Sequence, residues 1–366
     1  MKKLLPGALA LAAFLSACAG GGDEKAPGAD GAKAGGAGGK VTLTGAGATF
    51  PAPIYSKWFS DYGQAHAVQV NYQSIGSGGG IQQVTAGTVD FGASDAPMTA
   101  EESARVPGIL QLPTVLGAVT VIYNVPGLAQ PLKLSGDVLA RIFLGKITRW
   151  NDPAIAADNA GVQLPASNIA VVHRSDGSGT TFVFTDYLAQ VSPEWKAAVG
   201  NGKSVKWPTG LGAKGNEGVA GAVKQTAGSI GYVELAYAMQ NRLSMASLKN
   251  AAGQYVAPSV DATAAAAAGV AERVAGGDFR VSLVNAPGAT TYPISTWTYL
   301  LVPPHWQDCG KARAFVGLVS WALAQGDDAA RQLDYAPLPD QVRMGVMQKL
   351  GTLTCGADNQ AVQPAA

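Results

Sequence analysis

HRSDGSGTTFVFTDYL, residues 173–188, is the stretch that decides the fold of this chain. The run IAVV before it, residues 169–172, is apolar and β-branched, which predicts a buried strand. The apolar residues after it recur at helical spacing, and they are Phe182, Val183, Phe184, Tyr187 and Leu188. The turn DGSGT between them therefore joins a strand to the N-terminus of a helix.

The turn in this stretch carries groups that suit an anion. A helix N-terminus presents unpaired backbone N–H groups and about half a positive charge. Arg174 adds a planar fork of donors that matches an oxyanion, and the glycines let backbone approach a ligand closely. The alternative is an ordinary strand–helix connection in which Ser178 is the N-cap.

The chain makes the same arrangement twice more. VTLT, residues 41–44, runs into GAGATFPAP and then into a helical pattern whose first turn suits Pro51 or Pro53. VQVNY, residues 68–72, runs into SIGSGGG, where Ser77 is placed to cap a further helix. A third strand, VDFGAS, ends at Asp95. Open α/β sheets bind ligands at the carboxyl ends of their strands, so these turns predict a shared anion site.

The N-terminus has the pattern of a secretory signal. Two lysines precede an apolar run, residues 4–15, which is too short to span a bilayer. The run ends in LSAC, which resembles a bacterial lipobox, so residues 1–18 are interpreted as a lipoprotein signal that leaves Cys18 as the lipid-carrying first residue. A plain signal peptide with an incidental cysteine is the alternative. Residues 19–39 are rich in Gly and Ala and predict a flexible tether.

Composition argues against several classes of function. The chain has 26 basic and 25 acidic residues without a Lys/Arg cluster, so no nucleic-acid partner is expected. The three histidines are scattered and the glycine motifs lack the spacing of nucleotide sites, so no metal or other cofactor is expected. If lipidation uses Cys18, then Cys309 and Cys355 remain as a candidate disulfide in an oxidising compartment.

Several long blocks of the sequence carry a resemblance to a known family. The blocks are GAGATFPAPIYSKW (45–58), SIGSGGGIQQV (74–84), VDFGASDAPM (89–98), HRSDGSGTTFVFTDYL (173–188), KWPTGLGAKGNEGVAG (206–221), GSIGYVELAYA (228–238) and ARQLDYAPLPDQV (330–342). In this order they are similar to the periplasmic phosphate-binding proteins of high-affinity phosphate ABC transporters. Residues 240–278 show no clear match, and neither does the Cys309–Cys355 pair.

The resemblance implies an α/β fold of the two-lobe, Venus-flytrap type (type II), with the ligand between the lobes. The apolar runs VLGAVTVIYN and TWTYLLV are candidates for strands that cross between the lobes. These crossings predict lobe I from residues 40–118 and 295–356, lobe II from residues 119–294, and a C-terminal tail from residues 357–366.

The resemblance also implies a set of phosphate-binding residues, carried over by motif position. The set is Thr49, Phe50, Ser77, Asp95, Arg174, Asp176, Ser178, Gly179 and Thr180. Thr49, Phe50 and Ser77 would supply hydroxyl or backbone donors, and Asp95 would be the carboxylate acceptor. Asp176 lies beside Arg174, so it either contacts the ligand or only pairs with the arginine.

The implied function is a lipid-anchored, monomeric, non-enzymatic receptor on the periplasmic side of the envelope. It would bind inorganic phosphate and deliver it to the membrane permease subunits of a phosphate ABC transporter. The alternative is a lipid-anchored secreted hydrolase or phosphatase that uses the Ser178 region. That region lacks the G-x-S-x-G elbow. His173 and Arg174 are neighbours on one strand and should point to opposite faces.

Overall fold

The computed structural model describes residues 40–128, 130–274 and 277–362. The predicted signal (residues 1–18), with Cys18, and the predicted tether (residues 19–39) lie outside these ranges. Within the described ranges, no helix combines the length and the apolar character that a membrane crossing requires.

One mixed β-sheet organises the described part of the chain. Its strands follow the order β2-β1-β3-β12-β4-β8-β6-β7, and β9 pairs separately with β4. The strands are β2 (Val68–Ser74), β1 (Val41–Gly47), β3 (Phe91–Ser94), β12 (Ser295–Val302), β4 (Leu110–Asn124), β8 (Ser229–Glu234), β6 (Ala170–Arg174), β7 (Leu211–Ala213) and β9 (Ser244–Met245). β12 therefore inserts a late segment of the chain between two early strands.

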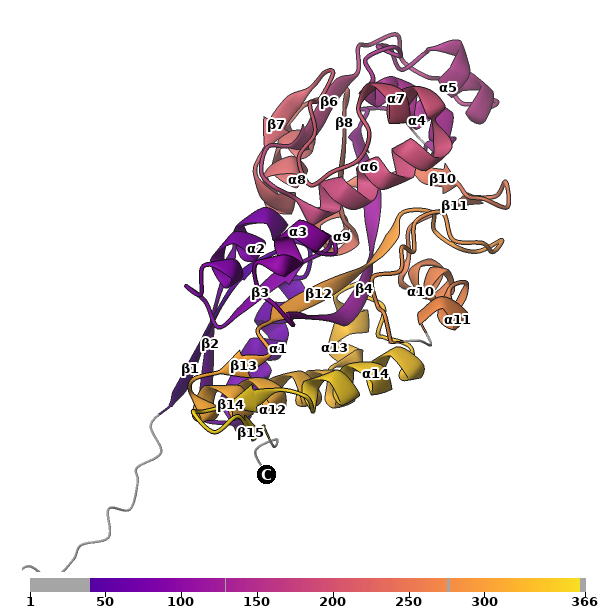
Figure 1. The fold of residues 1–366 in the computed structure, drawn as a ribbon. Coiled ribbons are helices and arrows are strands. Elements are labelled where there is room, and N and C mark those ends of the chain that lie inside the picture. The colour runs from indigo at the N-terminus through magenta and orange to yellow at the C-terminus, as the bar shows by residue number, and fades with distance from the viewer. Residues whose placement is uncertain (1–39, 129, 275–276, 363–366) are drawn as a thin grey trace, which may run out of the picture. The chain divides into compact units, whose positions relative to one another are not determined.

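Strand β4 belongs to both halves of this sheet. Its residues 110–118 pair antiparallel with β12, and its residues 119–124 pair antiparallel with β8 (Figure 1). It begins five residues before the predicted crossing strand, at Leu110 rather than Val115. The apolar run is nearly continuous because β4 is buried on both faces over most of its length. The result is the two-lobe α/β arrangement that the family resemblance implies.

Helices cover both halves of the sheet (Figure 1). Around β1, β2, β3 and β12 lie α1 (Ala52–Ala65), α2 (Ser77–Thr85), α3 (Ala100–Ala104), α12 (Cys309–Gln325), α13 (Asp327–Gln332) and α14 (Asp340–Leu350). Around β6, β7 and β8 lie α4 (Gly136–Phe143), α5 (Pro153–Asp158), α6 (Gly179–Val191), α7 (Pro193–Ala198), α8 (Gly215–Gln225) and α9 (Leu235–Gln240).

Two short sheets complete the fold. The first joins β5 (Lys133–Leu134), β10 (Ser247–Lys249) and β11 (Tyr255–Val256), and α10 (Val260–Ala268) and α11 (Ala271–Val274) follow it in the chain. The second joins β13 (His305–Trp306), β14 (Thr354–Cys355) and β15 (Gln360–Ala361). The first sheet draws two of its strands from the segment 240–278. The sequence predicts a tail for residues 357–366, but β15 lies inside this stretch and pairs with β14.

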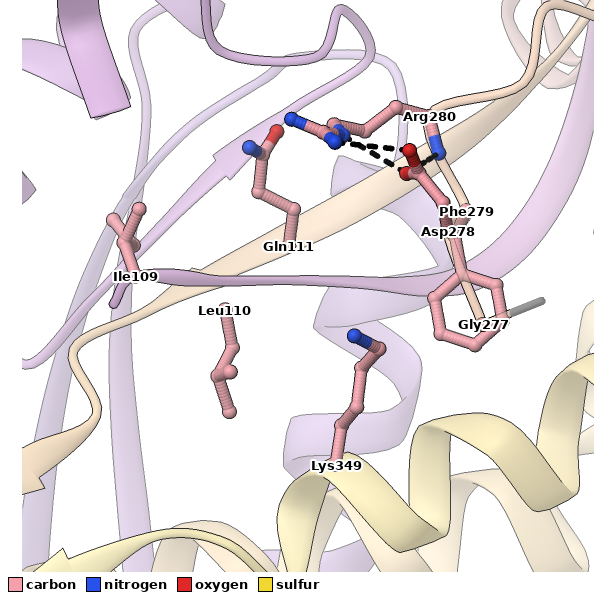
Figure 2. A pocket seen from close by; sticks show the side chains of 8 residues that line it. All are labelled: Ile109, Leu110, Gln111, Gly277, Asp278, Phe279, Arg280 and Lys349. Atoms are coloured by element: carbon pink, nitrogen blue, oxygen red, sulfur yellow. Dashed lines mark hydrogen bonds and ion pairs between the residues drawn. The ribbon is translucent and has the colours of Figure 1, made fainter. Parts of the chain in front are cut away.

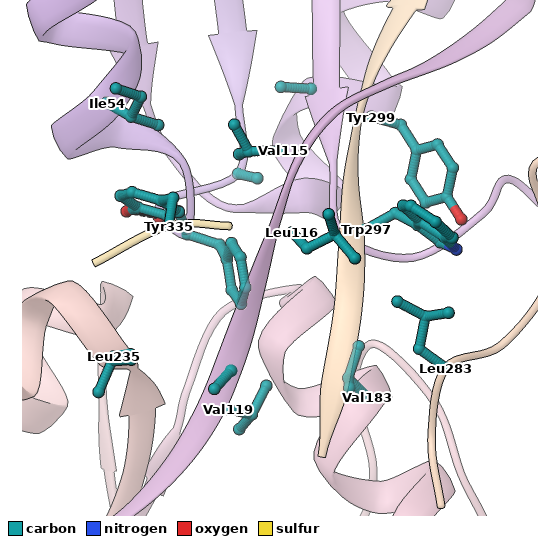
Figure 3. Packing of buried hydrophobic residues seen from close by; sticks show 14 of the residues in the cluster. Ile54, Val115, Leu116, Val119, Val183, Leu235, Leu283, Trp297, Tyr299 and Tyr335 are labelled. Carbon is teal, nitrogen blue, oxygen red and sulfur yellow. Dashed lines mark hydrogen bonds between the residues drawn. The ribbon is translucent and has the colours of Figure 1, made fainter. Parts of the chain in front are cut away.

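A buried cluster packs around β4 and β12 where the two halves of the sheet meet (Figure 3). Val115, Leu116 and Val119 of β4 are fully buried or nearly so. Trp297 and Tyr299 of β12 pack on the same cluster, and their polar atoms donate to the carbonyls of residues 281 and 279. Satisfied polar tips allow these large rings to be buried without an unpaired donor.

A disulfide joins Cys309 at the start of α12 to Cys355 in β14, with a Cα–Cα distance of 5.1 Å. The closed loop spans a sequence separation of 46, for which the chain-entropy model gives at most about 4 kcal/mol. We expect the Cys309→Ser/Cys355→Ser double variant to lose up to that much free energy of unfolding, measured by urea denaturation. Two alkylatable thiols in protein purified without reductant would contradict the pairing.

Candidate anion-binding site

The carboxyl ends of two groups of parallel strands face each other across the middle of the sheet. β1, β2 and β3 are mutually parallel, as are β6, β7 and β8. β12 is antiparallel to β3 and β4, and β8 is antiparallel to β4, so the two groups run in opposite directions. The turns after these strands therefore meet, and each leads into a helix N-terminus or a carboxylate.

Ser77 lies at the centre of this meeting point, with a role that differs from the predicted one. The N-cap of α2 is Gly76, and Ser77 is already the first residue of the helix, so the predicted capping role is wrong. Its hydroxyl instead accepts the backbone N–H groups of Gly179 (3.0 Å) and Asp95 (3.3 Å). Gly76 has φ +89°, a conformation that side chains disfavour, and this bends the chain so that Ser77 faces Gly179.

Asp95 is a carboxylate buried among donors. Its side-chain Oδ1 accepts the hydroxyl of Thr298 at 3.0 Å, and Oδ2 faces the hydroxyl of Ser77 at 3.5 Å. Desolvation raises the pKa of Asp95 to about 7, although Thr298, the charge of Arg174 and two hydroxyls act in the opposite direction. A Cβ on Gly179 would lie 2.6 Å from Oδ2, so only glycine permits this close approach.

Arg174 is the buried cation of the site, and Asp176 is its partner. Nε of Arg174 donates to Oδ1 of Asp176 at 2.8 Å and Nη2 donates to Oδ2 at 2.5 Å. Burial alone would raise the pKa of Asp176, but hydrogen bonds and charge from Arg174, with the N–H of Gly215, lower it below the ordinary value. Both oxygens of Asp176 are thus engaged within the protein. The remaining nitrogen of Arg174, Nη1, points at the hydroxyl of Thr180 at 3.3 Å.

Ser178, Gly179 and Thr180 form the N-terminus of α6. Ser178 is the N-cap, because its hydroxyl accepts the N–H of Thr181 at 3.0 Å. The capping interpretation and the anion-site interpretation of this turn are therefore compatible, since the capping oxygen keeps a hydroxyl proton to donate. The hydroxyl of Thr180 is fully buried and accepts from Arg174 and from Asn216.

Backbone N–H groups without a protein partner lie beside Arg174 and form a candidate cradle for an anion. Among the residues the structure describes, the N–H groups of Phe50, Ser77 and Thr180 donate to no protein acceptor. Phe50 contributes only through its backbone, because its ring is buried and packs against Tyr335. Unpaired N–H groups at helix starts, together with an arginine, are groups that suit an anion.

Two residues of the cluster were missed by the sequence analysis. Asn216 at the start of α8 donates to the hydroxyl of Thr49 at 2.7 Å and to Thr180 at 3.3 Å. Tyr237 in α9 donates its hydroxyl to the carbonyl of Thr49 at 2.6 Å. Asn216 follows β7 in one more strand–turn–helix entry, and that repeated pattern was the available signal. Nothing in the local sequence marks Tyr237.

Further contacts tie the two sides together at the edge of the site. The N–H of Gly78 donates to the carbonyl of Gly177 at 2.8 Å. The side chain of Lys203 pairs with Glu102 at 2.7 Å, while its backbone carbonyl accepts the N–H of Ser178 at 2.8 Å. The turn that starts α6 is thus held from both sides.

A pocket of about 250 Å³ leads to Asp95, and its wall includes Arg280, Asp186 and Tyr299. Arg280 also lines a second pocket of about 320 Å³, shown in Figure 2, whose other cation is Lys349. In the second pocket Arg280 is paired with Asp278, and none of the predicted phosphate-binding residues lines that pocket. Across the described residues, no group of His, Cys, Asp and Glu has the arrangement of a metal site.

The fold and the site together define a class of protein. A family model described as the PBP superfamily domain matches residues 32–323, which is more than half of the chain. A phosphate-binding protein from Stenotrophomonas maltophilia has the same fold, with a TM-score of 0.65 and 24% identity over 84% of this chain and 93% of that one. The chain is thus a two-lobe binding protein of this superfamily.

Curated relatives identify the family within that class. The phosphate-binding protein PstS of Pasteurella multocida is 52% identical over 88% of this chain and 93% of its own length. The protein of the same name from Haemophilus influenzae is 50% identical over 82% of this chain and 90% of its own length. This chain belongs to the PstS family of phosphate-binding proteins.

Proposed function

We propose that this chain captures inorganic phosphate on the periplasmic side of the cell envelope and delivers it to the permease subunits of an ABC transporter. The observation that carries the proposal is a buried carboxylate, Asp95, set among donors that would otherwise suit any oxyanion. Relatives with about half of their residues identical carry the name phosphate-binding protein, which supports the same ligand.

The chemistry of phosphate fits this mixture of groups. At neutral pH the anion carries one or two protons, so it can donate to an ionised Asp95, which only accepts. Its other oxygens accept hydrogen bonds from Arg174, from the hydroxyls and from the backbone N–H groups of the three turns. Asp176 would hold Arg174 in place and contact no ligand, because both of its oxygens are already used.

The two lobes would close around the ligand by bending at a hinge between them. We take lobe I as residues 40–118 and 295–356 and lobe II as residues 119–294, because β4 exchanges its partner between Ala118 and Val119. β4 and β12 are the strands that connect the lobes, and bending at such connections allows closure. The proposed site needs only one copy of the chain, which is consistent with a monomer.

Binding of phosphate by the purified chain tests this proposal directly. Isothermal titration with phosphate should show one site per chain, and a competition series should show strong preference over sulfate. Absence of heat and of retained radiolabelled phosphate would overturn the proposal. Arsenate, which has the same protonation states, should compete with phosphate.

A hydrolase that uses Ser178 is not favoured by the geometry. The Ser178 hydroxyl caps α6, and no hydrogen bond joins it to a histidine among the described residues. The ring of His173 stacks on Trp207, with centroids 4.7 Å apart, and its Nδ1 lies 3.0 Å from the carbonyl oxygen of Arg174. The imidazole of His173 is thus engaged with Trp207 and with the backbone of Arg174. Release of phosphate from a phosphomonoester by the purified chain would revive the hydrolase alternative.

Membrane attachment through Cys18 is part of the proposal and rests on the sequence LSAC. We expect Cys18→Ser to abolish lipid attachment and lipoprotein cleavage, because the sulfur atom of the cysteine carries the lipid. The measurement is labelling of cells with radioactive palmitate, followed by fractionation of membranes. Unlabelled wild-type protein, or a Cys18→Ser variant that still carries label, would show that the anchor lies elsewhere.

A further inference from the structure

We infer that Thr298 is a positioning residue that gives the two oxygens of Asp95 different roles. Its hydroxyl holds Oδ1 and leaves Oδ2 to accept the proton of the bound anion. The inference rests on the proposed function, and it deepens it by naming a residue that sets selectivity without contacting the ligand. Thr298 belongs to none of the turns that supply anion donors. It lies in β12, far along the chain from Asp95.

The register of the sheet places Thr298 beside Asp95. β12 pairs antiparallel with β3, and Tyr299 is opposite Ser94. If the same register continues by one residue, Thr298 lies opposite Asp95, the residue directly after β3. The pairing of β12 with β4 shifts between Thr298 and Tyr299, which marks an irregularity at this position.

The hydrogen bonds from β12 orient the carboxylate of Asp95. The hydroxyl of Thr298 donates to Oδ1 of Asp95 at 3.0 Å, and both residues are at most 1% exposed. The hydroxyl of Thr296 lies 3.4 Å from the backbone carbonyl of Asp95, so β12 holds this residue by main chain and side chain. Oδ2 points the other way, toward Gly179.

Thr298 is itself held by a buried polar chain. The hydroxyl of Thr114 in β4 donates to the carbonyl of Thr298 at 3.4 Å. Thr114 in turn shares a 2.8 Å hydrogen bond with the hydroxyl of Tyr55 in α1. All of these groups are buried. A satisfied buried network of this kind restricts side chains to one arrangement.

Loss of the Thr298 hydroxyl should change the protonation of Asp95. Burial raises the pKa of Asp95 to about 7, and the Thr298 hydrogen bond is the largest effect that opposes burial. Without that bond the pKa rises further, so the carboxyl is protonated at higher pH and becomes a donor. The other titratable groups that neighbour Asp95 or line its pocket are Arg174, Asp186, Arg280, Tyr55, Tyr72, Tyr237, Tyr299, Tyr335 and Glu234.

Sulfate is the probe that separates this effect from general damage. Sulfate does not titrate near neutral pH, so any pH dependence of its binding reports a group of the protein. It should bind better as the pH falls through the pKa of Asp95, because a protonated carboxyl can donate to it. The tyrosines stay neutral in this range, since burial raises their pKa values above the ordinary one.

The test is a set of phosphate and sulfate titrations between about pH 5.5 and 8.5 on wild type and Thr298→Val. We expect the midpoint of sulfate binding to move up by about one pH unit or more in the variant. Sulfate affinity should then rise by less than about twofold at pH 7, where wild-type Asp95 is already partly protonated, and by severalfold, approaching tenfold, near pH 8.5. Phosphate affinity should fall. Thr298→Ser, which keeps the hydroxyl, should behave like wild type.

Thr120→Val is the matched control. Thr120 lies in β4, is fully buried, and its hydroxyl has no partner among the described residues. Glu234→Gln tests whether another buried carboxyl produces the pH effect, and it should leave the midpoint in place. Thr298→Ala provides a second hydroxyl-free variant if Thr298→Val fails to fold, as judged by thermal denaturation.

The outcomes separate the inference from the function on which it rests. Wild-type protein that binds no phosphate overturns the proposed function. If wild type binds phosphate, but Thr298→Val and Thr298→Ala keep its sulfate rejection and its midpoint, only the assignment of Thr298 is wrong. An equal loss of phosphate and sulfate affinity with no shift of the midpoint would show a structural role and would also overturn the assignment.

Discussion

Asp95→Asn is expected to bind sulfate measurably while it keeps part of its affinity for phosphate. Sulfate has no proton to donate, so above the pKa of Asp95, which burial raises to about 7, sulfate in a closed site would leave the ionised carboxylate unpaired and facing a like charge. Sites built around one required hydrogen bond can reject an analogue that lacks it by about 10⁴-fold or more. The amide keeps the shape and replaces an acceptor with a donor.

The geometry indicates which way the side-chain amide of the Asp95→Asn variant would turn. The amide oxygen would accept from Thr298, as Oδ1 of Asp95 does, so the NH₂ group would take the place of Oδ2 and face the ligand. Paired titrations with phosphate and sulfate on wild type and variant give the measurement. Glu234→Gln, which alters a fully buried carboxyl in β8, is the control and should still reject sulfate. A variant that rejects sulfate as strongly as wild type would place the discrimination elsewhere.

Arg174→Ala is expected to weaken phosphate binding at least tenfold. Arg174 is the buried cation beside the cradle, and its side chain is 1% exposed. Hydrogen bonds to charged groups contribute about 1.5–3 kcal/mol each, and about 1.4 kcal/mol corresponds to a factor of ten. Calorimetry on the variant gives the change in affinity, and an unchanged value would remove Arg174 from the site.

Two further variants separate loss of the ligand contact from loss of the ion pair. Removal of Arg174 alone leaves the largely buried carboxylate of Asp176 without its partner, which costs stability by itself. The Arg174→Ala/Asp176→Ala double variant removes both charges, so it should recover stability but not affinity. Arg280→Ala breaks a pair of the same spacing, with Asp278, that is about half exposed. It should cost far less stability than the loss of Arg174, because exposed ion pairs contribute little.

The local sequence was sufficient wherever a short segment determines its own structure. The apolar periodicity and the turn glycines predicted that strands lead into helices around Thr49, Ser77 and Ser178, and β1, β2, β6, α1, α2 and α6 confirm it. Ser178 caps α6 because its position relative to Thr181 is fixed within a few residues. Asp95 directly follows β3, as predicted.

The role of Ser77 could not be obtained in this way. A serine at a helix start most often caps that helix, and local reasoning predicted a cap. The glycines of SIGSGGG let Gly76 take the N-cap position, and the Ser77 hydroxyl then turns to Gly179, more than a hundred residues away. A tertiary partner therefore overrode the local preference.

By itself, the sequence determined the α/β class and the order of the strand–turn–helix units, because these depend on periodicity and on motifs of a few residues. The tertiary structure alone decided which distant groups complete the site. Asn216, Tyr237 and Thr298 reach Thr49 or Asp95 only because β4 joins two sheet halves and β12 inserts beside β3. Strand order and register are long-range properties, and hydrogen bonds across them leave no trace in local spacing.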